Sequence, residues 1–341
     1  MKSFKNISFY LYTKFKTSKN NSSINKSLEN GINIKKLKIK KNIRFYTVGS
    51  SNNYYANILK NNIIEGLEDN FNFEFTNDKP DYLIYDIFYC DFLDSNYNNS
   101  IKIAFYTENQ IPDFNKADYA IGFQNINYLD RYFRKTTLIW KLENNFLNIK
   151  NKDFKKKRNK ALKKKRNNFC AAVISNSMFT DGFRMKFINE LSKYKKIDMG
   201  GNFNNNIGGP VKNKVKFLSS YKFSIAMENT EGQGYISEKI LDSFIAGTIP
   251  IYYGGYMVDE FINPKSFILI KNEKDMKEKI EYIKKIDKDE DLYKHILKED
   301  LFINDDLVKE SKKEKLKFFN NIFEQEKEKA KRIDKYHWNI Y

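Results

Sequence analysis

Residues 227–255 read MENTEGQGYISEKILDSFIAGTIPIYYGG and decide the fold class. EKILDSFIA at 238–246 has apolar residues at helical spacing, and TIPIYYGG at 248–255 is a β-branched and aromatic run that ends in two glycines. Ser237 stands where a helix N-cap is expected, and Gly247 where the helix should stop. With the apolar run YKFSIAMEN in front, this strand–helix–strand order predicts a parallel sheet covered by helices.

The start of the predicted helix has the chemistry of a phosphate site. If Ser237 caps the helix, Glu238 and Lys239 lie in its first turn, where free backbone N–H groups favour an anion. The Lys239 ammonium adds a positive charge, and Glu238 is suited to accept hydrogen bonds from sugar hydroxyls. Tyr235 offers a ring and a hydroxyl. Together they would fit a sugar nucleotide, although Glu–Lys at a helix start is most often structural.

Similar short apolar runs occur on both sides of this stretch. In the first half they are IRFYTVGS at 43–50, DYLIYDIF at 81–88, IKIAFYT at 101–107 and DYAIGF at 118–123, with helical spacing at 54–71. In the second half, NFCAAVISN at 168–176 is a predicted strand, DGFRMKFINELSKY at 181–194 an amphipathic helix, KIDMGGNFNNNIGG at 196–209 a loop and SFILI at 266–270 a strand. Two such halves predict an α/β protein with twin Rossmann-like domains facing a cleft, followed by a charged helical segment. Ligands of such sheets bind at the carboxyl ends of strands.

Three further residues stand where this architecture would place a ligand. Arg184 begins the helix after the strand AAVISN, where its fork could bind a pyrophosphate, although a surface arginine is equally expected. Glu108 follows the strand IKIAFYT directly and could take a proton from a hydroxyl. Asp113 is an equally good candidate by position, and a solvated loop acid is the alternative for both carboxylates.

Composition limits the function classes. The chain has 341 residues and a net charge of +18, which favours acidic partners, or else reflects a compositional bias. Cys90 and Cys170 lack metal-type spacing, and the two histidines, His295 and His337, are too few for a histidine triad. No apolar run is long enough for a transmembrane helix, and the start of the chain is a poor match to a signal peptide. We therefore expect a cytoplasmic protein.

The domain boundaries are predicted from these patterns. We expect a basic arm at 1–40, a first Rossmann-like domain at 41–150, a basic linker at 151–168, a second Rossmann-like domain at 169–290 and a charged helical tail at 291–341. The linker should be largely solvated because its like charges repel, and part of it could be helical. It has few aromatic side chains for stacking on bases, so specific nucleic-acid binding is not expected.

The basic segments could instead hold the protein weakly on an anionic membrane surface. The candidates are the arm, the run at 150–168 and the lysine-rich tail near 308–332. The tail places Leu316, Phe319, Ile322 and Phe323 on one helical face. That face could meet lipid, but docking on the first domain is favoured.

Three segments together resemble glycosyltransferase family ten, the α-1,3/4-fucosyltransferases, in its bacterial form. KFSIAMENTEGQGYISEKILDSFIAGTIPIYYGG is similar to the family's donor-binding motif. AAVISNSMFTDGFRMKFINELSKYKKIDMGG resembles its Val-Ser-Asn strand and arginine helix, and FYTENQIPDFNKADYAIGF its Tyr-Thr-Glu-Asn segment. The resemblance covers roughly residues 42–275 and implies a GT-B fold, with the acceptor on the N-terminal domain and GDP-fucose on the C-terminal one.

The resemblance also implies residue roles and chemistry. Glu108 matches the family's general base, Arg184 and Lys239 its pyrophosphate contacts, and Glu238 a ribose contact. The remaining matched donor-site positions are Asn229, Tyr235, Ser175 and Asn176. The implied reaction is transfer of fucose with inversion. No metal ion is obligatory for it, and a divalent ion would at most stimulate. The implied acceptor is a glycan with an N-acetyllactosamine-like unit, with O3 of GlcNAc as the favoured hydroxyl.

This sequence departs from the family motif at Met227, which replaces a Phe, and at Ser237, which replaces a Thr. Both changes are mild. The first domain outside FYTEN matches weakly, so the acceptor and the choice between 3- and 4-linkage stay open. The rival hypotheses are a transferase of another nucleotide sugar, a basic nucleic-acid-binding protein and an inactive carbohydrate-binding relative.

Overall fold

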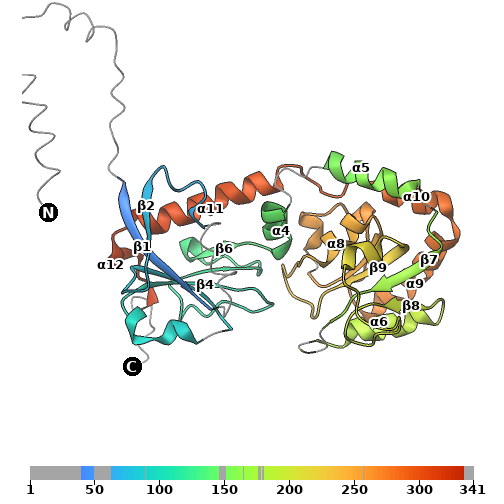
Figure 1. The fold of residues 1–341 in the computed structure, drawn as a ribbon, viewed down its shortest axis with the longest axis horizontal. Coiled ribbons are helices and arrows are strands. Elements are labelled where there is room, and N and C mark those ends of the chain that lie inside the picture. Colours follow the sequence, from blue (N-terminus) through green and yellow to red (C-terminus); the bar gives the residue numbers. More distant parts are fainter. Residues whose placement is uncertain are drawn as a thin grey trace, which may run out of the picture. The chain divides into compact units, whose positions relative to one another are not determined.

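The computed structural model describes residues 40–49, 63–88, 90–145, 151–163, 165–175, 178, 180–255 and 257–333 (Figure 1). The chain divides into two units, residues 1–41 and 42–341, and the features described here belong almost entirely to the second. Residues 1–39 of the predicted basic arm and residues 54–62 of the helix predicted over 54–71 lie outside the described residues. In the rest of that predicted helix, only Ile63 and Ile64 are helical, and a turn at 65–70 leads into the next strand.

A parallel sheet forms the first half. In the described residues its strand order is β2-β1-β3-β4-β5-β6. The strands are β1 Lys41–Val48, β2 Phe71–Phe75, β3 Tyr82–Asp86, β4 Ile101–Phe105, β5 Tyr119–Gly122 and β6 Tyr132–Arg134. From β1 to β6 by way of β3, β4 and β5, each neighbouring pair is parallel. The carboxyl ends of these strands therefore share one edge, which is where such sheets bind ligands.

The charged C-terminal tail docks on this first sheet. Helix α11, Leu307–Glu324, contributes Phe319, Ile322 and Phe323 to the core that contains Ile43 and Phe45 of β1. The Phe323 ring meets the Tyr82 ring edge-on at 4.9 Å between centroids. The predicted docking of this part of the tail on the first domain is confirmed. Burial of these rings stabilises the docked helix, while its charged face can stay in water. The short helix α12, Lys327–Ala330, follows.

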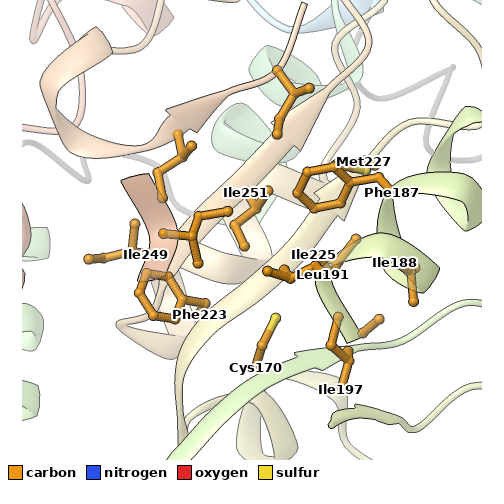
Figure 2. Close-up of a cluster of buried hydrophobic side chains, with 14 of the residues drawn as sticks. Cys170, Phe187, Ile188, Leu191, Ile197, Phe223, Ile225, Met227, Ile249 and Ile251 are labelled. Carbon is orange, nitrogen blue, oxygen red and sulfur yellow. The ribbon is translucent and has the colours of Figure 1, made fainter. Parts of the chain in front are cut away.

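A second parallel sheet forms the other half, with strand order β11-β10-β9-β7-β8 in the described residues. Its strands are β7 Asn168–Ala172, β8 Ile197–Met199, β9 Tyr221–Met227, β10 Ile249–Tyr253 and β11 Ile268–Leu269. Neighbouring strands are parallel throughout. Helices α6 Phe183–Ser192, α9 Glu273–Lys288 and α10 Glu290–Lys298 contribute to the core on one face. Figure 2 shows the α6 side chains Phe187, Ile188 and Leu191 in this core together with side chains of the strands.

The opposite face of this sheet is covered by other helices. Residues of α4 Thr137–Asn145, α5 Asn151–Leu162 and α8 Lys239–Ala246 join Ala226 of β9 and Tyr252 of β10 in one cluster. The five-residue helix α7, Lys214–Leu218, packs nearby. Single-turn 3₁₀ helices occupy Asp91–Leu93, Ser95–Tyr97, Leu129–Arg131, Val258–Glu260 and Pro264–Ser266. The structure thus confirms two Rossmann-like sheets, each covered on both faces.

Several elements differ from the sequence prediction. Strands β2, β6 and β8 and helix α7 were not predicted, and β8 lies in the segment predicted as a loop. These elements have three to five residues each, too few to show a periodicity. The predicted solvated linker contains α5, whose Phe154 and Arg158 side chains are fully buried. Arg158 donates to the carbonyls of Glu299 and Ser266, so this basic helix is docked rather than free in solvent.

Among the helices that the structure describes, none combines the length and the apolarity that a membrane span requires.

Candidate functional site

A cavity of about 460 Å³ brings together segments from both halves of the chain. The first half contributes residues that follow the carboxyl ends of its strands, together with the start of α4. The second half contributes the segment that leads into α8. The lining residues are Gly49, Asp86, Phe88, Phe105, Tyr106, Thr107, Glu108, Phe123, Lys135, Thr136, Thr137, Trp140, Tyr235, Ser237, Glu238 and Lys239. Four of the predicted site residues, Glu108, Tyr235, Glu238 and Lys239, therefore share one cavity.

Behind the second-half wall of this cavity lies Glu228, a residue that sequence analysis did not select. Its side chain is fully buried directly after strand β9. One carboxylate oxygen accepts a hydrogen bond from the Ser237 amide at 2.7 Å. The other accepts from the Ser237 hydroxyl at 2.7 Å and from Lys239 Nζ at 2.8 Å. A buried carboxylate with this many donors holds the loop before α8 in one conformation.

The paired glycines that end the motif make room for this carboxylate. Gly254 has φ +146, and a Cβ atom there would lie 2.3 Å from Cγ of Glu228. A side chain at this position would displace Glu228 and, with it, the ammonium of Lys239. The Gly255 amide donates to the Tyr235 carbonyl at 3.0 Å. This bond holds the loop before α8 in place, in addition to the Glu228 contacts. The sequence signal for Glu228 was therefore an acid directly after an apolar strand, with glycines after the neighbouring strand.

Lys239 presents a positive charge at the cavity. Its side chain is 23% exposed, and its ammonium also donates to Ser237 Oγ at 3.1 Å. Burial lowers its pKa, but the negative charges of Glu228 and Glu238 outweigh burial and hold the pKa above the ordinary value. The ammonium is therefore charged at neutral pH and can face an anion in the cavity.

The start of α8 differs by one residue from the prediction. The helix begins at Lys239, and Glu238, not Ser237, occupies the N-cap position without a side-chain cap. The Ser237 hydroxyl instead donates to Glu228, while its oxygen accepts from the Lys239 amide at 3.3 Å. The buried carboxylate competes with the helix end for this hydroxyl. The predicted stop at Gly247 is confirmed.

A hydrogen bond joins the two halves at the candidate base. The Tyr235 hydroxyl donates to Glu108 Oε2 at 2.7 Å. Tyr235 is 3% exposed, and its ring packs edge-on against Phe123 at 5.3 Å. Burial first, and then the charges of Glu228 and Glu108, raise the pKa of Tyr235, so its hydroxyl keeps its proton and acts as a donor. In the described residues Glu108 Oε1 has no hydrogen-bond partner, which leaves it available to a ligand.

The structure separates Glu108 from its rival Asp113. Glu108 is exposed and lines the cavity, as predicted for a residue at the carboxyl end of β4. Asp113 does not line the cavity. Its carboxylate pairs with Lys116 at 3.2 Å and accepts from the Asn115 amide at 3.1 Å. Position along the sequence could not distinguish these acids, whereas the cavity does.

Arg184 and Asn229 form a pair beside the cavity. Arg184 is 4% exposed and donates to Asn229 Oδ1 at 2.9 Å. Burial lowers the pKa of Arg184, while the negative charges of Glu228 and Asp181 raise it. Neither residue lines the cavity, so the structure places this predicted pyrophosphate contact behind the surface of the second half. Exposed Ser175 follows β7 and also lies outside the cavity lining, and Asn176 falls outside the described residues.

Other contacts tie the two halves together around the site. Asn109, next to Glu108, donates to Thr230 Oγ1 at 2.8 Å. Arg134 pairs with Glu260 at 2.7 Å. The first contact positions the loop that carries Glu108 against the loop that follows β9, and the second joins β6 to the 3₁₀ helix Val258–Glu260. Within the described residues, no cluster of three or more His, Cys, Asp or Glu side chains is placed to hold a metal ion.

Two family models cover most of the chain. The model of the glycosyltransferase family 10 (fucosyltransferase) C-terminal region matches residues 162–332. The model of the α-(1,3)-fucosyltransferase FucT N-terminal domain matches residues 43–140. The chain belongs to glycosyltransferase family 10. Its two Rossmann-like sheets constitute the GT-B fold that the sequence predicted.

Individual members of family 10 agree with this assignment. The chain is 35% identical to the α-(1,3)-fucosyltransferase FucT of Helicobacter pylori over 235 residues, which are 60% of this chain and 48% of that protein. A crystal structure of an α1,3-fucosyltransferase with GDP superposes with a TM-score of 0.67 at 26% identity, covering 85% of this chain and 92% of that one. A structure with GDP-fucose gives a TM-score of 0.64 at 27% identity, covering 84% and 92%. The chain spans about half the length, or less, of curated relatives that it matches.

Proposed function

We infer that this protein transfers L-fucose from GDP-fucose to a hydroxyl of a glycan, as an inverting α-1,3-fucosyltransferase. The observation that carries this proposal is the cavity that is lined both by a carboxylate of the first half, Glu108, and by an ammonium of the second half, Lys239. Such an arrangement offers a base on one side and a site for a leaving phosphate on the other. Membership of family 10 supplies the class of donor.

In the proposed mechanism, Glu108 takes the proton of the acceptor hydroxyl as its oxygen attacks the anomeric carbon of fucose. The bond from that carbon to the diphosphate oxygen breaks, and GDP leaves with one more negative charge. Lys239, which lines the cavity, and the backbone N–H groups at the start of α8 stabilise this charge, and buried Arg184 adds positive charge from behind the second-half surface. Because Glu228 and Asn229 already hold the two cations, little reorganisation is needed during the reaction.

The remaining donor-site roles follow the family resemblance. Glu238 accepts hydrogen bonds from the ribose, and Tyr235 packs beside the donor while it orients Glu108. Asn229, Ser175 and Asn176 complete the donor side. We place the acceptor on residues 41–150 and GDP-fucose on residues 169–290, with the docked C-terminal helices as a support for both.

The acceptor in this proposal is a glycan with an N-acetyllactosamine-like unit, modified at O3 of GlcNAc. Curated relatives include 4-galactosyl-N-acetylglucosaminide 3-α-L-fucosyltransferase 9 of several mammals, 33% identical over 113 residues. The test is incubation with GDP-fucose and a panel of type 1 and type 2 disaccharides. Transfer to type 2 acceptors supports 3-linkage, and transfer to type 1 alone would indicate 4-linkage. Turnover of another sugar nucleotide in preference to GDP-fucose would overturn the donor assignment.

The charge stabilisation in this mechanism comes from side chains, with a divalent ion at most stimulatory. The measurement is the transfer rate after treatment with EDTA, and after addition of Mg²⁺ or Mn²⁺. A modest change fits the proposal. Complete loss with EDTA and full recovery with one metal ion would contradict it.

We also propose that the protein works in the cytoplasm, with weak attachment to an anionic membrane surface. The exposed side chains of Lys163 and Lys165, at the end of the basic segment, support this. Each basic residue near such a surface contributes about 1 kcal/mol. Sedimentation with anionic and neutral vesicles tests attachment. Binding to anionic vesicles that fades with salt supports it, and absence of binding at low salt refutes it.

A further inference from the structure

A second carboxylate lines the same cavity as Glu108 and has no place in the mechanism above. Asp86 ends strand β3, next to β4 and its following Glu108. Both acids line the cavity on its first-half wall. Neighbouring parallel strands thus deliver two carboxylates to one opening, at the edge of the sheet where ligands bind.

The local structure fixes Asp86 in place. Its Oδ1 accepts from the Phe88 amide at 3.1 Å, and among the described residues this is its one hydrogen bond. Gly49, after the neighbouring strand β1, has φ +123, and a Cβ atom there would lie 2.6 Å from Cβ of Asp86. A glycine at 49 therefore lets the two strand ends approach closely. One carboxylate oxygen is anchored, and the other, Oδ2, has no hydrogen-bond partner among the residues that the structure describes.

The surroundings of Asp86 raise the energy of its charged form. Burial is the larger cause that raises its pKa, the Phe88 hydrogen bond opposes it, and the charge of Glu108 raises the pKa further. A carboxylate kept in such surroundings gains more from a hydroxyl donor than a solvated one does.

The rest of this wall suits a neutral sugar. The Trp140 side chain of α4 lines the cavity and packs on Phe105, with ring centroids 4.7 Å apart. Thr136 and Thr137, at the start of α4, line it as well. Lys135 also lines the cavity, where its ammonium lies 5.0 Å from the centre of the Trp140 ring and is paired with Glu143. Aromatic side chains with a few fixed polar groups are the composition of sites that bind and orient small polar ligands.

We propose that Asp86 is a positioning residue for the acceptor, binding hydroxyl groups of its sugar ring so that the attacking hydroxyl reaches Glu108. This inference rests on the proposed function and deepens it, because it assigns the acceptor side of the site to Asp86, Trp140 and the α4 start. The donor side lies across the cavity, so Asp86 governs acceptor affinity and leaves GDP affinity unchanged.

The test compares Asp86→Asn with the matched control Asp113→Asn, an acid of the same half outside the cavity. Steady-state kinetics with N-acetyllactosamine should show acceptor KM raised about tenfold or more in Asp86→Asn, the scale of one charge-assisted hydrogen bond. The KM for GDP-fucose should stay within about twofold, and Asp113→Asn should resemble wild type. Calorimetry with GDP, also within about twofold of wild type, establishes that the variant is folded.

A second measurement separates this inference from the proposed function. Binding of N-acetyllactosamine to the GDP complex, followed by ligand-observed NMR, needs no turnover. Loss of that binding in Asp86→Asn alone supports the inference, even for a wild type that transfers no fucose. The inference is overturned if Asp86→Asn binds the disaccharide as tightly as wild type does, or if its acceptor KM equals that of wild type. It is also overturned if the wild-type protein binds no disaccharide. Transfer by wild type with unchanged acceptor KM in Asp86→Asn leaves the proposed function standing and removes only this inference.

Discussion

Replacing Lys239 by alanine should lower both the stability of the fold and the affinity of the proposed GDP site. Its ammonium pairs with the buried carboxylate of Glu228 and also lines the cavity. At the observed 2.8 Å, the attraction to Glu228 is about 6 kcal/mol at an effective dielectric constant of 20. Partial exposure of Lys239, and the Ser237 donors that remain on Glu228, reduce the net loss. We expect unfolding free energy to fall by about 3 kcal/mol, the low end for breaking a buried pair. That loss corresponds to roughly 5 °C or more in Tm.

The same substitution should weaken GDP binding about 10- to 150-fold, since it removes a charge-assisted contact. Thermal unfolding and calorimetry with GDP measure the two effects. Lys186→Ala is the control, because its pair with Glu273 is exposed and should be worth less than about 1 kcal/mol. In a Glu228→Gln background the stability effect of Lys239→Ala should shrink. A Lys239→Ala protein with wild-type Tm and GDP affinity would refute the reasoning.

Three other substitutions test the hydrogen bonds and charges of the site and of the fold. Tyr235→Phe removes the donor to Glu108, so turnover should fall about tenfold while calorimetry shows GDP affinity within about twofold. Asp86→Asn should raise Tm at neutral pH, because the raised pKa of Asp86 means that its charged form destabilises the folded state. The gain should vanish on acidification, when the wild-type Asp86 is protonated and therefore neutral like the asparagine. Asp287→Asn should lower Tm at neutral pH, because hydrogen bonds from two lysines and a tyrosine outweigh burial and lower the pKa of Asp287. That difference should narrow as pH falls through the lowered pKa, below about 3.9. For either Asp variant, a Tm difference from wild type that does not change with pH would contradict the pKa shift assigned to that residue.

The fold could be predicted largely because its longer elements carry clear patterns. The runs around Phe45, Ile103 and Ile225 are short, apolar and bounded by turn residues, which is how buried parallel strands read. The face of α11 was visible from the spacing of Phe319, Ile322 and Phe323, although the docking partner was a choice between two surfaces. Burial of α5 was not visible, because Arg158 gains carbonyl partners from segments more than one hundred residues away.

The site was predictable where chemistry and position coincide along the chain. Tyr235, Glu238 and Lys239 are close in sequence and therefore remain close in space. Glu228 was missed because its role depends on hydrogen bonds to a loop nine residues later. Asp86 was missed for a similar reason, since its approach to Glu108 depends on the order of strands in the sheet.

The measurement that tests the account most directly is the turnover and GDP affinity of Glu108→Gln. The substitution preserves shape and removes the proton acceptor. We predict that GDP affinity is nearly unchanged and that turnover falls roughly a hundred-fold or more. Fucose transfer by Glu108→Gln at the wild-type rate, with Asp113→Asn inactive, would contradict the account and move the base to Asp113.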